Sequence, residues 1–396
     1  MSNGDFPRPA RRFEGVGFSE IVRVRNRVME LLAAGQKVWR FEGGEPWMHT
    51  PDAVKAAMGE ALARNQTRYA PSSGIPELRK AILAKVRERN GIPADDESPV
   101  VVNGGMQGLF AGFAALLDPG DEVLMFSPYW TPIVDLIAYH EAKPVLVPTA
   151  AARRGGLTAA LAAKTTAKTK VLYWNSPNNP TGDVFSRREV EEVAAFAAGR
   201  GLAVISDEAY EDLVYEGEPV TAMASLPGMF ERTITAYTLS KSYSMTGWRL
   251  GYVVAPRRYQ SAIKTVLLYT TNGVSTPTQW AAVTALARGT EYVAEWKKGY
   301  RERRDRLVAG LKAAGFGIEA PRAALYLFPT IPAWLGSDSR QAARTLLDEA
   351  KIATVPGIVF GAEGEAHLRF SFSVSEEMIA GGVEALAAFA SAAASH

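Results

Sequence analysis

Residues 233–252 read TITAYTLSKSYSMTGWRLGY. The β-branched and aromatic run at 233–237 predicts a buried strand. Lys241 follows this run among hydroxyl groups, a glycine and aromatic rings, with Arg249 eight residues later. In such surroundings an amine can lose its proton and attack a carbonyl carbon, although most lysines are solvated surface charges. Whether Lys241 is reactive therefore has to be judged from the residues that accompany it elsewhere in the chain.

On both sides of this stretch, short apolar runs alternate with helix-length segments between about residues 50 and 290. This alternation is typical of a parallel sheet with crossover helices, so the sequence predicts an α/β fold. Ser186 is expected to cap a helix over 187–200. The expected strands lie at 100–102, 122–126, 171–174, 203–206, 233–237 and 251–254.

The C-terminal part of the chain has a different pattern. One long helix is expected from about residue 279 to 314, and its charged stretch, Lys297 to Arg306, predicts a solvated helix face because both signs are interspersed. The final block, 315–396, mixes short strands with helices and predicts a smaller α+β domain. We therefore expect a large domain at 50–290, and an N-terminal arm and small domain formed by 1–49 together with 291–396.

The composition is that of an ordinary globular protein. The 396 residues carry a net charge of +2, which predicts neither a nucleic-acid nor a membrane partner. The chain has no cysteine and four histidines, which excludes thiolate chemistry and argues against a metal centre. The polar start and the lack of a long apolar run predict a cytoplasmic protein.

Three further polar side chains follow the ends of predicted strands. Asn179 lies after the strand at 171–174, and Asp207 and Tyr210 come directly after the strand at 203–206. Ligands of an open parallel sheet bind beyond the carboxyl ends of its strands, so these side chains are expected to share a pocket with Lys241. The plain alternatives are a turn-rich loop at 175–182 and a helix N-cap at Asp207. An aldehyde cofactor with an aromatic nitrogen would need this set of an amine, a carboxylate and hydrogen-bond donors.

Taken together, these motifs resemble a known enzyme family. Asn-Pro-Thr-Gly at 179–182, Asp-Glu-Ala-Tyr at 207–210 and Ser-Lys at 240–241 with Arg-Leu-Gly at 249–251 are similar to the signature of class I/II pyridoxal 5'-phosphate (PLP)-dependent aminotransferases of fold type I. The likeness to this aspartate aminotransferase-like family runs from Gly-Gly-Glu-Pro at 43–46 to Arg369. It implies a mostly parallel central sheet with helices on both faces. It also implies that an amino group moves from an L-amino acid to a 2-oxo acid in two half-reactions, through a Lys241 aldimine.

The catalytic residues that the resemblance implies are Lys241, Asp207 and Tyr210. Lys241 would form the aldimine and shuttle a proton, and Asp207 would pair with the protonated ring nitrogen. Tyr210 and Asn179 would hydrogen-bond the ring hydroxyl oxygen. The implied substrate-binding residues are Gly44, Asn179 and Arg369, of which Arg369 would grip the α-carboxylate.

The resemblance also implies a larger set of PLP-binding residues. The Gly-rich loop at 103–108 precedes a predicted helix, whose N-terminus suits a phosphate. Met106 could contribute only its backbone, and Tyr69 is expected to reach the phosphate of the neighbouring subunit in a homodimer. Trp130, rather than Tyr129, is expected to stack on the ring. The full set is Tyr69, Gly104, Gly105, Met106, Trp130, Asn179, Asp207, Tyr210, Thr238, Ser240, Lys241 and Arg249.

The sequence leaves the substrate and the exact reaction open. Trp47, Tyr326 and Phe18 suggest room for an aromatic or bulky apolar side chain, and no lysine or arginine is assigned to a distal carboxylate. A PLP-dependent lyase, cyclase or oxidase would need the same cofactor residues. A non-catalytic PLP-sensing regulator would need a DNA-binding module, for which the roughly 50 residues before the sheet leave little room. A nicotinamide oxidoreductase would leave Lys241 and Asp207 unexplained.

Overall fold

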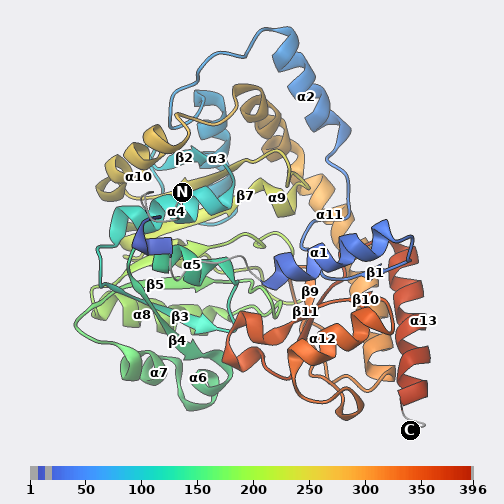
Figure 1. The fold of residues 1–396 in the computed structure, drawn as a ribbon. Helices are drawn as coiled ribbons and strands as arrows, with labels where there is room; N and C mark the ends of the chain where they lie inside the picture. The colour runs from blue at the N-terminus through green and yellow to red at the C-terminus, as the bar shows by residue number, and fades with distance from the viewer. Residues whose placement is uncertain (1–7, 14–19, 394–396) are drawn as a thin grey trace, which may run out of the picture.

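The computed structural model describes residues 8–13 and 20–393. At its centre is a seven-stranded sheet with the strand order β2-β8-β7-β6-β5-β3-β4 (Figure 1). Strands β3 to β7 are parallel, whereas β8 runs antiparallel to β2 and β7. The strands are β2 (Pro99–Val102), β3 (Glu122–Ser127), β4 (Lys143–Pro148), β5 (Thr169–Asn175), β6 (Ala203–Asp207), β7 (Thr233–Thr238) and β8 (Gly251–Val254).

Helices cover both faces of this sheet because successive strand residues point to opposite sides. Val100 and Val102 pack in the core shared with α4, α5 and α10, whereas Val101 packs in the core shared with α3 and α11. The mostly parallel sheet with helices on both faces is therefore confirmed. The helices before the C-terminal part are α1 (Glu20–Ala33), α2 (Asp52–Ala63), α3 (Pro76–Glu88), α4 (Gly105–Leu116), α5 (Pro132–Tyr139), α6 (Thr149–Gly155), α7 (Leu157–Lys164), α8 (Arg187–Gly199), α9 (Leu239–Ser242) and α10 (Arg257–Thr270).

The six expected strands are all present, with ends within two residues of the prediction. Ser186 caps α8 as predicted: its hydroxyl accepts from the Glu189 N–H, and the Glu189 carboxylate accepts from the Ser186 N–H. The edge strand β4 was missed. Its sequence, KPVLVP, begins and ends beside prolines, which are rare in strands except at a sheet edge.

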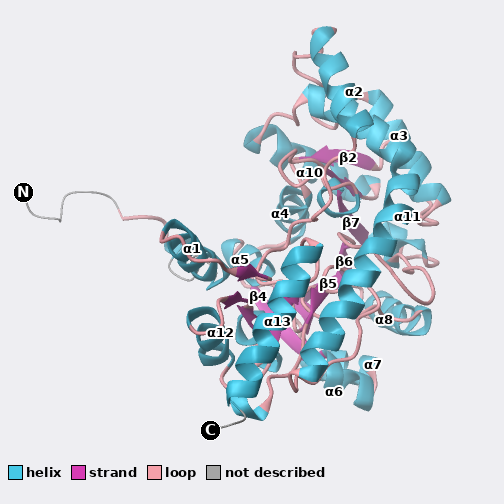
Figure 2. Cartoon of the chain, turned by 90° about the vertical axis from the view of Figure 1, so that its right-hand side faces the viewer, coloured by secondary structure: helices cyan, strands magenta, loops and turns pink. Residues whose placement is uncertain are grey.

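The long helix α11 (Thr276–Ala313) leads from the sheet to the C-terminal block and packs along α13 (Figure 2). In that block β11, β12 and β9 form an antiparallel sheet, while β1 of the N-terminal segment pairs with β10. The predicted domain boundary at residue 290 falls inside α11, and the two-domain division stays a prediction. The remaining elements are β1 (Trp39–Arg40), β9 (Tyr326–Leu327), α12 (Ser339–Asp348), β10 (Ile352–Ala353), β11 (Val355–Pro356), β12 (Leu368–Ser371) and α13 (Glu376–Ala393).

The charged stretch of α11 is not the fully solvated face that its sequence predicts. Arg303 and Arg304 are buried. Arg304 donates to the carbonyl of Pro321 and pairs with Glu216 at 2.6 Å, while Arg303 lies 3.1 Å from Glu376. The prediction was wrong for these two residues. They lie on the packed side of α11, where carboxylates from other elements pair with both of them and a carbonyl accepts from Arg304.

The carboxyl ends of β5, β6 and β7 lie next to one another at one edge of the sheet. The backbone register places Asn175 opposite Asp207, and Asp207 opposite Ala236. Side chains that follow these three strands therefore converge, as expected for a ligand site of a parallel sheet. Within the described residues, none of the helices is both long and apolar enough to span a bilayer.

Candidate active site

Lys241 lies in the short helix α9, directly after β7. The hydroxyl of Thr238 accepts a hydrogen bond from the N–H of Ser240 at 3.2 Å, which caps the helix. The Lys241 side chain is only partly buried, and its Nζ donates to the carbonyl oxygen of Gly44 at 2.7 Å. The predicted reactive lysine and the predicted substrate-binding glycine are therefore in direct contact.

The loop that carries Gly44 is fastened to the segment after Lys241 by further hydrogen bonds. The indole N–H of Trp248 donates to Thr50 Oγ1 at 3.1 Å, and the hydroxyl of Ser244 donates to the carbonyl of Met48. Residues 44–50 and 241–248 thus form one bonded unit, although about 200 positions separate them in the sequence.

Asp207 is the last residue of β6, and its side chain is buried. The hydroxyl of Tyr173 donates to Asp207 Oδ2 at 2.8 Å, and the N–H of Ala209 donates to Oδ1 at 3.3 Å. Burial raises the pKa of Asp207 to about 6, and these two hydrogen bonds and the nearby Lys241 charge limit the rise. The carboxyl group is therefore mostly ionised at neutral pH.

Tyr210 faces a residue that the sequence did not place in the catalytic set. Its hydroxyl lies 2.9 Å from the hydroxyl of Tyr326, on β9. Burial, together with the Tyr326 hydroxyl, raises the pKa of Tyr210 well above its ordinary value, while Arg369 opposes the rise. A Cβ atom added to Gly44 would lie 2.8 Å from the Tyr326 hydroxyl, so the glycine leaves the room that this tyrosine occupies.

Arg369, on β12, is 3 % exposed and reaches into the same region. Its Nη1 donates to Asn179 Oδ1 at 3.2 Å and its Nη2 donates to the carbonyl of Glu42 at 2.9 Å. The guanidinium carbon lies 4.4 Å from the ring centre of Tyr326 and 5.1 Å from that of Phe360. Its Nε–H has no hydrogen-bond partner among the described residues, and burial lowers the pKa of the group. A buried cation with an unused donor is suited to a carboxylate ligand.

The predicted phosphate-binding residues also converge. Gly104 has a φ of +81°, and a Cβ added there would lie 2.6 Å from Nη2 of Arg249. A Cβ added to Gly105 would lie 3.3 Å from Cβ of Thr238, whose hydroxyl donates to Ser240 Oγ at 2.9 Å. Arg249 is exposed, donates to the carbonyl of Thr246, and pairs with no carboxylate in the described part of the chain. Backbone N–H groups, hydroxyls and an unpaired guanidinium make a cradle for a phosphate.

For three predicted cofactor residues, the structure gives no contact with the described residues around Lys241. Met106 is exposed in the first turn of α4, and Trp130 is half-buried in the loop after β3. Tyr69 is 90 % exposed. Phe18, expected near the substrate side chain, lies outside the described residues, and Trp47 is half-exposed.

Tyr173 and Tyr326 contact the predicted catalytic residues Asp207 and Tyr210, but the sequence did not predict these contacts. Tyr173 sits inside a predicted strand, and its contact with Asp207 depends on the pairing of β5 with β6. For Tyr326 the sequence suggests only that it borders room for the substrate side chain. Neither contact leaves a local signal in the sequence, because each joins segments that are distant along the chain.

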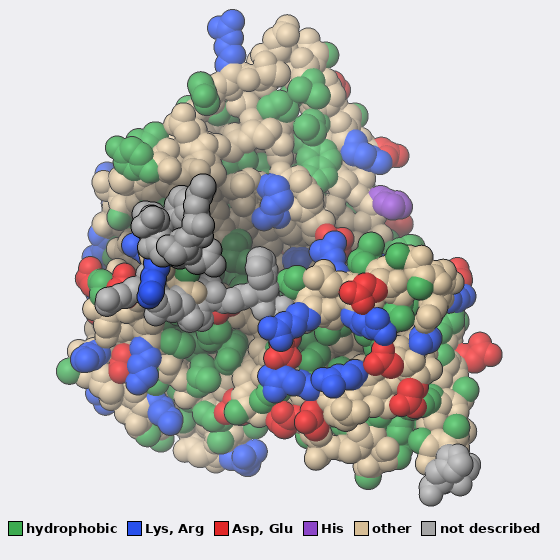
Figure 3. Space-filling model, viewed as in Figure 1, with side chains coloured by type: hydrophobic (Ala, Val, Ile, Leu, Met, Phe, Trp, Pro, Cys, Tyr) green, Lys and Arg blue, Asp and Glu red, His purple; other side chains and the backbone are tan. Residues whose placement is uncertain are grey.

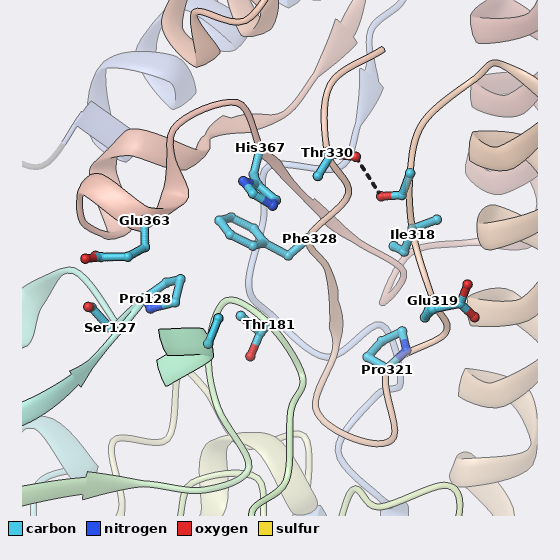
Figure 4. Close-up of a pocket in the computed structure, with 12 residues that line it drawn as sticks. Ser127, Pro128, Thr181, Ile318, Glu319, Pro321, Phe328, Thr330, Glu363 and His367 are labelled. Atoms are coloured by element: carbon cyan, nitrogen blue, oxygen red, sulfur yellow. Dashed lines mark hydrogen bonds between the residues drawn. The ribbon is translucent and has the colours of Figure 1, made fainter. Parts of the chain in front are cut away.

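Apart from the cluster around Lys241, a cleft of about 350 Å³ lies between the sheet and the C-terminal block (Figure 4). We call it the second cleft. Thr181 lines it from the loop after β5, and Phe328, Glu363 and His367 line it from the C-terminal block. The rings of Phe328 and His367 stack at 4.9 Å. None of the predicted site residues lines this cleft, so it is distinct from the cluster around Lys241.

Comparison with known proteins decides the family. The family model described as aminotransferase class I and II matches residues 37–386. The chain belongs to this family. The aminotransferase is 39 % identical over 373 residues to a probable aspartate/prephenate aminotransferase of Aquifex aeolicus, covering 92 % of this chain and 94 % of the relative.

Two solved structures are similar to the aminotransferase over most of their length. The aspartate aminotransferase of Thermus thermophilus with maleate has a TM-score of 0.91 and 36 % identity, covering 97 % of this chain and all of that one. The aromatic aminotransferase of Pyrococcus horikoshii has a TM-score of 0.85 and 36 % identity, covering 91 % and 98 %. These relatives are named aminotransferases, and none is named a lyase, cyclase, oxidase or regulator.

The aminotransferase is PLP-dependent and moves an amino group from an amino acid to a 2-oxo acid. Its residues fit that cofactor. Lys241 would offer the amine for the aldehyde, buried Asp207 would offer a negative charge for the ring nitrogen, and the cradle at Gly104 and Arg249 has no room for a Cβ.

Proposed function

We propose that the contacts around Lys241 form the catalytic centre of this aminotransferase, with the roles that the sequence motifs imply. The observation that supports this most directly is the position of Arg369. Its buried guanidinium is fixed by Asn179 and has an unused Nε–H, at the edge of the sheet where Lys241 and Asp207 also lie. An α-carboxylate bound there would bring the α-carbon of a substrate toward the lysine amine.

Each residue would then have a distinct task. Bound PLP supplies the electron sink for the charge that remains when the substrate α-proton leaves. The Lys241 amine would attach the cofactor, and would take and return that proton. The carbonyl of Gly44 would hold Lys241 Nζ in position. Asp207 would keep positive charge at the ring nitrogen, and Tyr210, supported by Tyr326, would donate to the ring oxygen.

We further propose that the enzyme accepts amino acids with aromatic or bulky apolar side chains. Aromatic rings of Tyr326 and Phe360 flank the Arg369 guanidinium, and Trp47 lies half-exposed on the loop fastened over Lys241. Aspartate is a second candidate donor, because the Aquifex aeolicus and Thermus thermophilus relatives are named for it.

A single-turnover donor panel would test this. Phenylalanine, tyrosine, leucine, aspartate and glutamate would each be mixed with the PLP-loaded enzyme without an acceptor, and the loss of the cofactor's visible absorbance would be followed. We expect phenylalanine and tyrosine to react with a higher kcat/KM than aspartate. A preference for aspartate would reject the aromatic proposal while leaving transamination intact.

We also propose a homodimer in which Tyr69 reaches the phosphate site of the partner subunit. Tyr69 and Tyr269 are 90 % and 83 % exposed, and Leu62 and Leu268 are each nearly half-exposed. Figure 3 shows hydrophobic side chains on the upper part of the molecule, where Figure 1 places α2 and α10. Such exposure is unusual unless a partner covers it.

Sedimentation equilibrium would test the dimer, and mixed dimers would test the shared site. Subunits carrying Tyr69→Ala and subunits carrying Lys241→Ala would be inactive or weak alone. If Tyr69 completes the neighbouring site, mixed dimers contain one intact site and regain about a quarter of the wild-type activity per total protein. A monomer in solution, or no regain of activity, would reject this arrangement. The cytoplasmic location also stays a prediction, which fractionation of producing cells would test.

A further inference from the structure

Behind Asp207 and the turn that carries Tyr210 lies a cluster of charges that the proposed mechanism does not use, and all of its members except the exposed Arg89 are buried or half-buried. We call it the rear cluster; its members are Lys85 of α3, Arg89 directly after that helix, Glu208, Glu211 and Asp212 of the turn, and Tyr237 of β7. Lys85, Glu208 and Tyr237 are 6 %, 2 % and 1 % exposed. Burying so many ionisable groups costs free energy unless each is paired.

Lys85 makes the central contacts of the rear cluster. Its Nζ forms an ion pair with Glu211 and donates to Asn90 Oδ1 at 3.2 Å. The same ammonium lies 4.4 Å from the ring centre of Tyr237. Arg89, one turn further along, pairs with Asp212. The C-terminal end of α3 is thus joined to the turn by two ion pairs, Lys85 with Glu211 and Arg89 with Asp212.

Glu208 ties the other end of the turn to the sheet. The hydroxyl of Tyr237 donates to Glu208 Oε2, and the hydroxyl of Ser206 donates to Oε1, both at 2.9 Å. The backbone N–H of Glu208 donates to the carbonyl of Ala236 at 3.1 Å. Lys85 therefore contacts both parts of the rear cluster. It pairs with Glu211, and it lies over the ring of Tyr237, whose hydroxyl donates to Glu208.

The turn therefore presents its side chains to two sides. Asp207 and Tyr210 contact Tyr173 and Tyr326 in the candidate active site, whereas Glu208 and Glu211 contact the rear cluster. Three carboxylates in the rear cluster face two cations. Removal of Lys85 would leave the mostly buried Glu211 without its cation and with Asn90 as its remaining donor, and movement of the turn toward solvent would relieve this cost.

We propose that Lys85 is a positioning residue, which sets the placement of Asp207 and Tyr210 through Glu211 and through the Tyr237–Glu208 pair. This inference rests on the proposed cofactor roles of Asp207 and Tyr210. Lys85 does not itself touch the reacting groups. A residue that holds a site group in place acts through the accuracy of that placement.

The experiment compares Lys85→Met with Lys80→Met, a matched control on the exposed side of α3. A double variant, Lys85→Met with Glu211→Leu, removes both partners of the buried pair. Three quantities would be measured: the Tm of the apoprotein, the Kd for PLP, and the visible circular dichroism of bound PLP, which reports how the cofactor is held. Lys85→Arg, which keeps the charge, would be measured alongside.

We expect Lys85→Met to lower the Tm and to weaken PLP binding by about tenfold. The double variant should regain most of the lost Tm, because Glu211 no longer stands buried without its cation. It should nevertheless keep the weakened binding and the altered dichroism, and Lys85→Arg should restore part of both. Lys80→Met should behave as the wild type.

If the double variant binds PLP with wild-type affinity and dichroism, Lys85 serves only stability and the inference is wrong. If Lys85→Met does not fold, the double variant and Lys85→Arg still decide the matter. Asp207→Asn tests the role of Asp207 separately from the role of Lys85. Unchanged PLP affinity and dichroism in that variant would reject the proposed role of Asp207 itself, whatever Lys85 does.

Discussion

Nη1 of Arg369 lies 3.2 Å from Oδ1 of Asn179. This hydrogen bond joins β12 of the C-terminal block to the loop after β5, across 190 residues of sequence. The Asn179 oxygen accepts from Arg369, and no side chain or carbonyl of the described residues accepts from its Nδ2 group, which is a donor. One asparagine can thus fix the guanidinium and still donate to a ligand.

Arg369→Lys should weaken substrate binding. A lysine cannot reproduce the bidentate fork, nor can it bond to Asn179 and Glu42 at once. We expect kcat/KM for an amino donor to fall by about 100-fold, with most of the loss in KM. Steady-state kinetics would measure this, with Arg344→Lys on the exposed side of α12 as the control. A loss in kcat alone would contradict the assigned role.

Lys241→Ala should abolish covalent attachment of PLP and its visible absorbance. The loss of both attachment and proton transfer should lower the transamination rate by about 10⁴-fold. Borohydride reduction followed by peptide mass spectrometry should place the cofactor on Lys241 in the wild type. Lys168→Ala, at an exposed position, serves as the control. A cofactor reduced onto another lysine would overturn the assignment.

Gly104→Ala should weaken PLP binding. The backbone at this position has a φ of +81°, and the new Cβ would lie 2.6 Å from the Arg249 guanidinium. Displacement of the Arg249 guanidinium should weaken its contact with the phosphate of PLP, and a loss of about 1.4 kcal/mol in binding corresponds to a tenfold higher Kd. Fluorescence titration of the apoprotein with PLP would measure it. Gly199→Ala, at the end of α8 where nothing lies within 4 Å, should change the Kd less than about twofold.

Glu208→Gln should change how stability depends on pH. Burial raises the pKa of Glu208 from 4.5 to about 7, so the folded protein holds this proton more tightly than the unfolded chain does. Stability from this group is therefore present below pH 4.5 and is lost as the pH rises to about 7, by on the order of 3 kcal/mol. Glutamine does not titrate, so the variant avoids this loss.

The measurement is the Tm of the apoprotein at pH 5 and pH 8, for the wild type and Glu208→Gln. We expect the Tm of the variant, relative to the wild type, to be higher at pH 8 than at pH 5 by about 3 °C. Parallel curves for the two proteins would show that Glu208 does not titrate in this range. Glu363→Gln, in the second cleft, provides a comparison outside the rear cluster.

Much of the candidate site is predictable from the sequence because its residues follow strands in short motifs. Asn179, Asp207 and Lys241 come after neighbouring parallel strands, and the edge where such strands end is the usual ligand site. Tyr173 and Tyr326 could not be placed in this way. A tyrosine inside a strand gives no sign of whether its hydroxyl meets a carboxylate on the next strand.

The sequence by itself determined the alternation of strands and helices, the capped start of α8 and the order of the cofactor motifs. These follow from local periodicity and turn chemistry, which act over a few residues. Only the tertiary structure decided the edge strand β4, the burial of Arg303 and Arg304, and the contacts of Lys241 with Gly44 and of Lys85 with Glu211. Each of these depends on which distant segments pack together, because pairing can stabilise a buried charge or a proline-bounded strand that local preference disfavours.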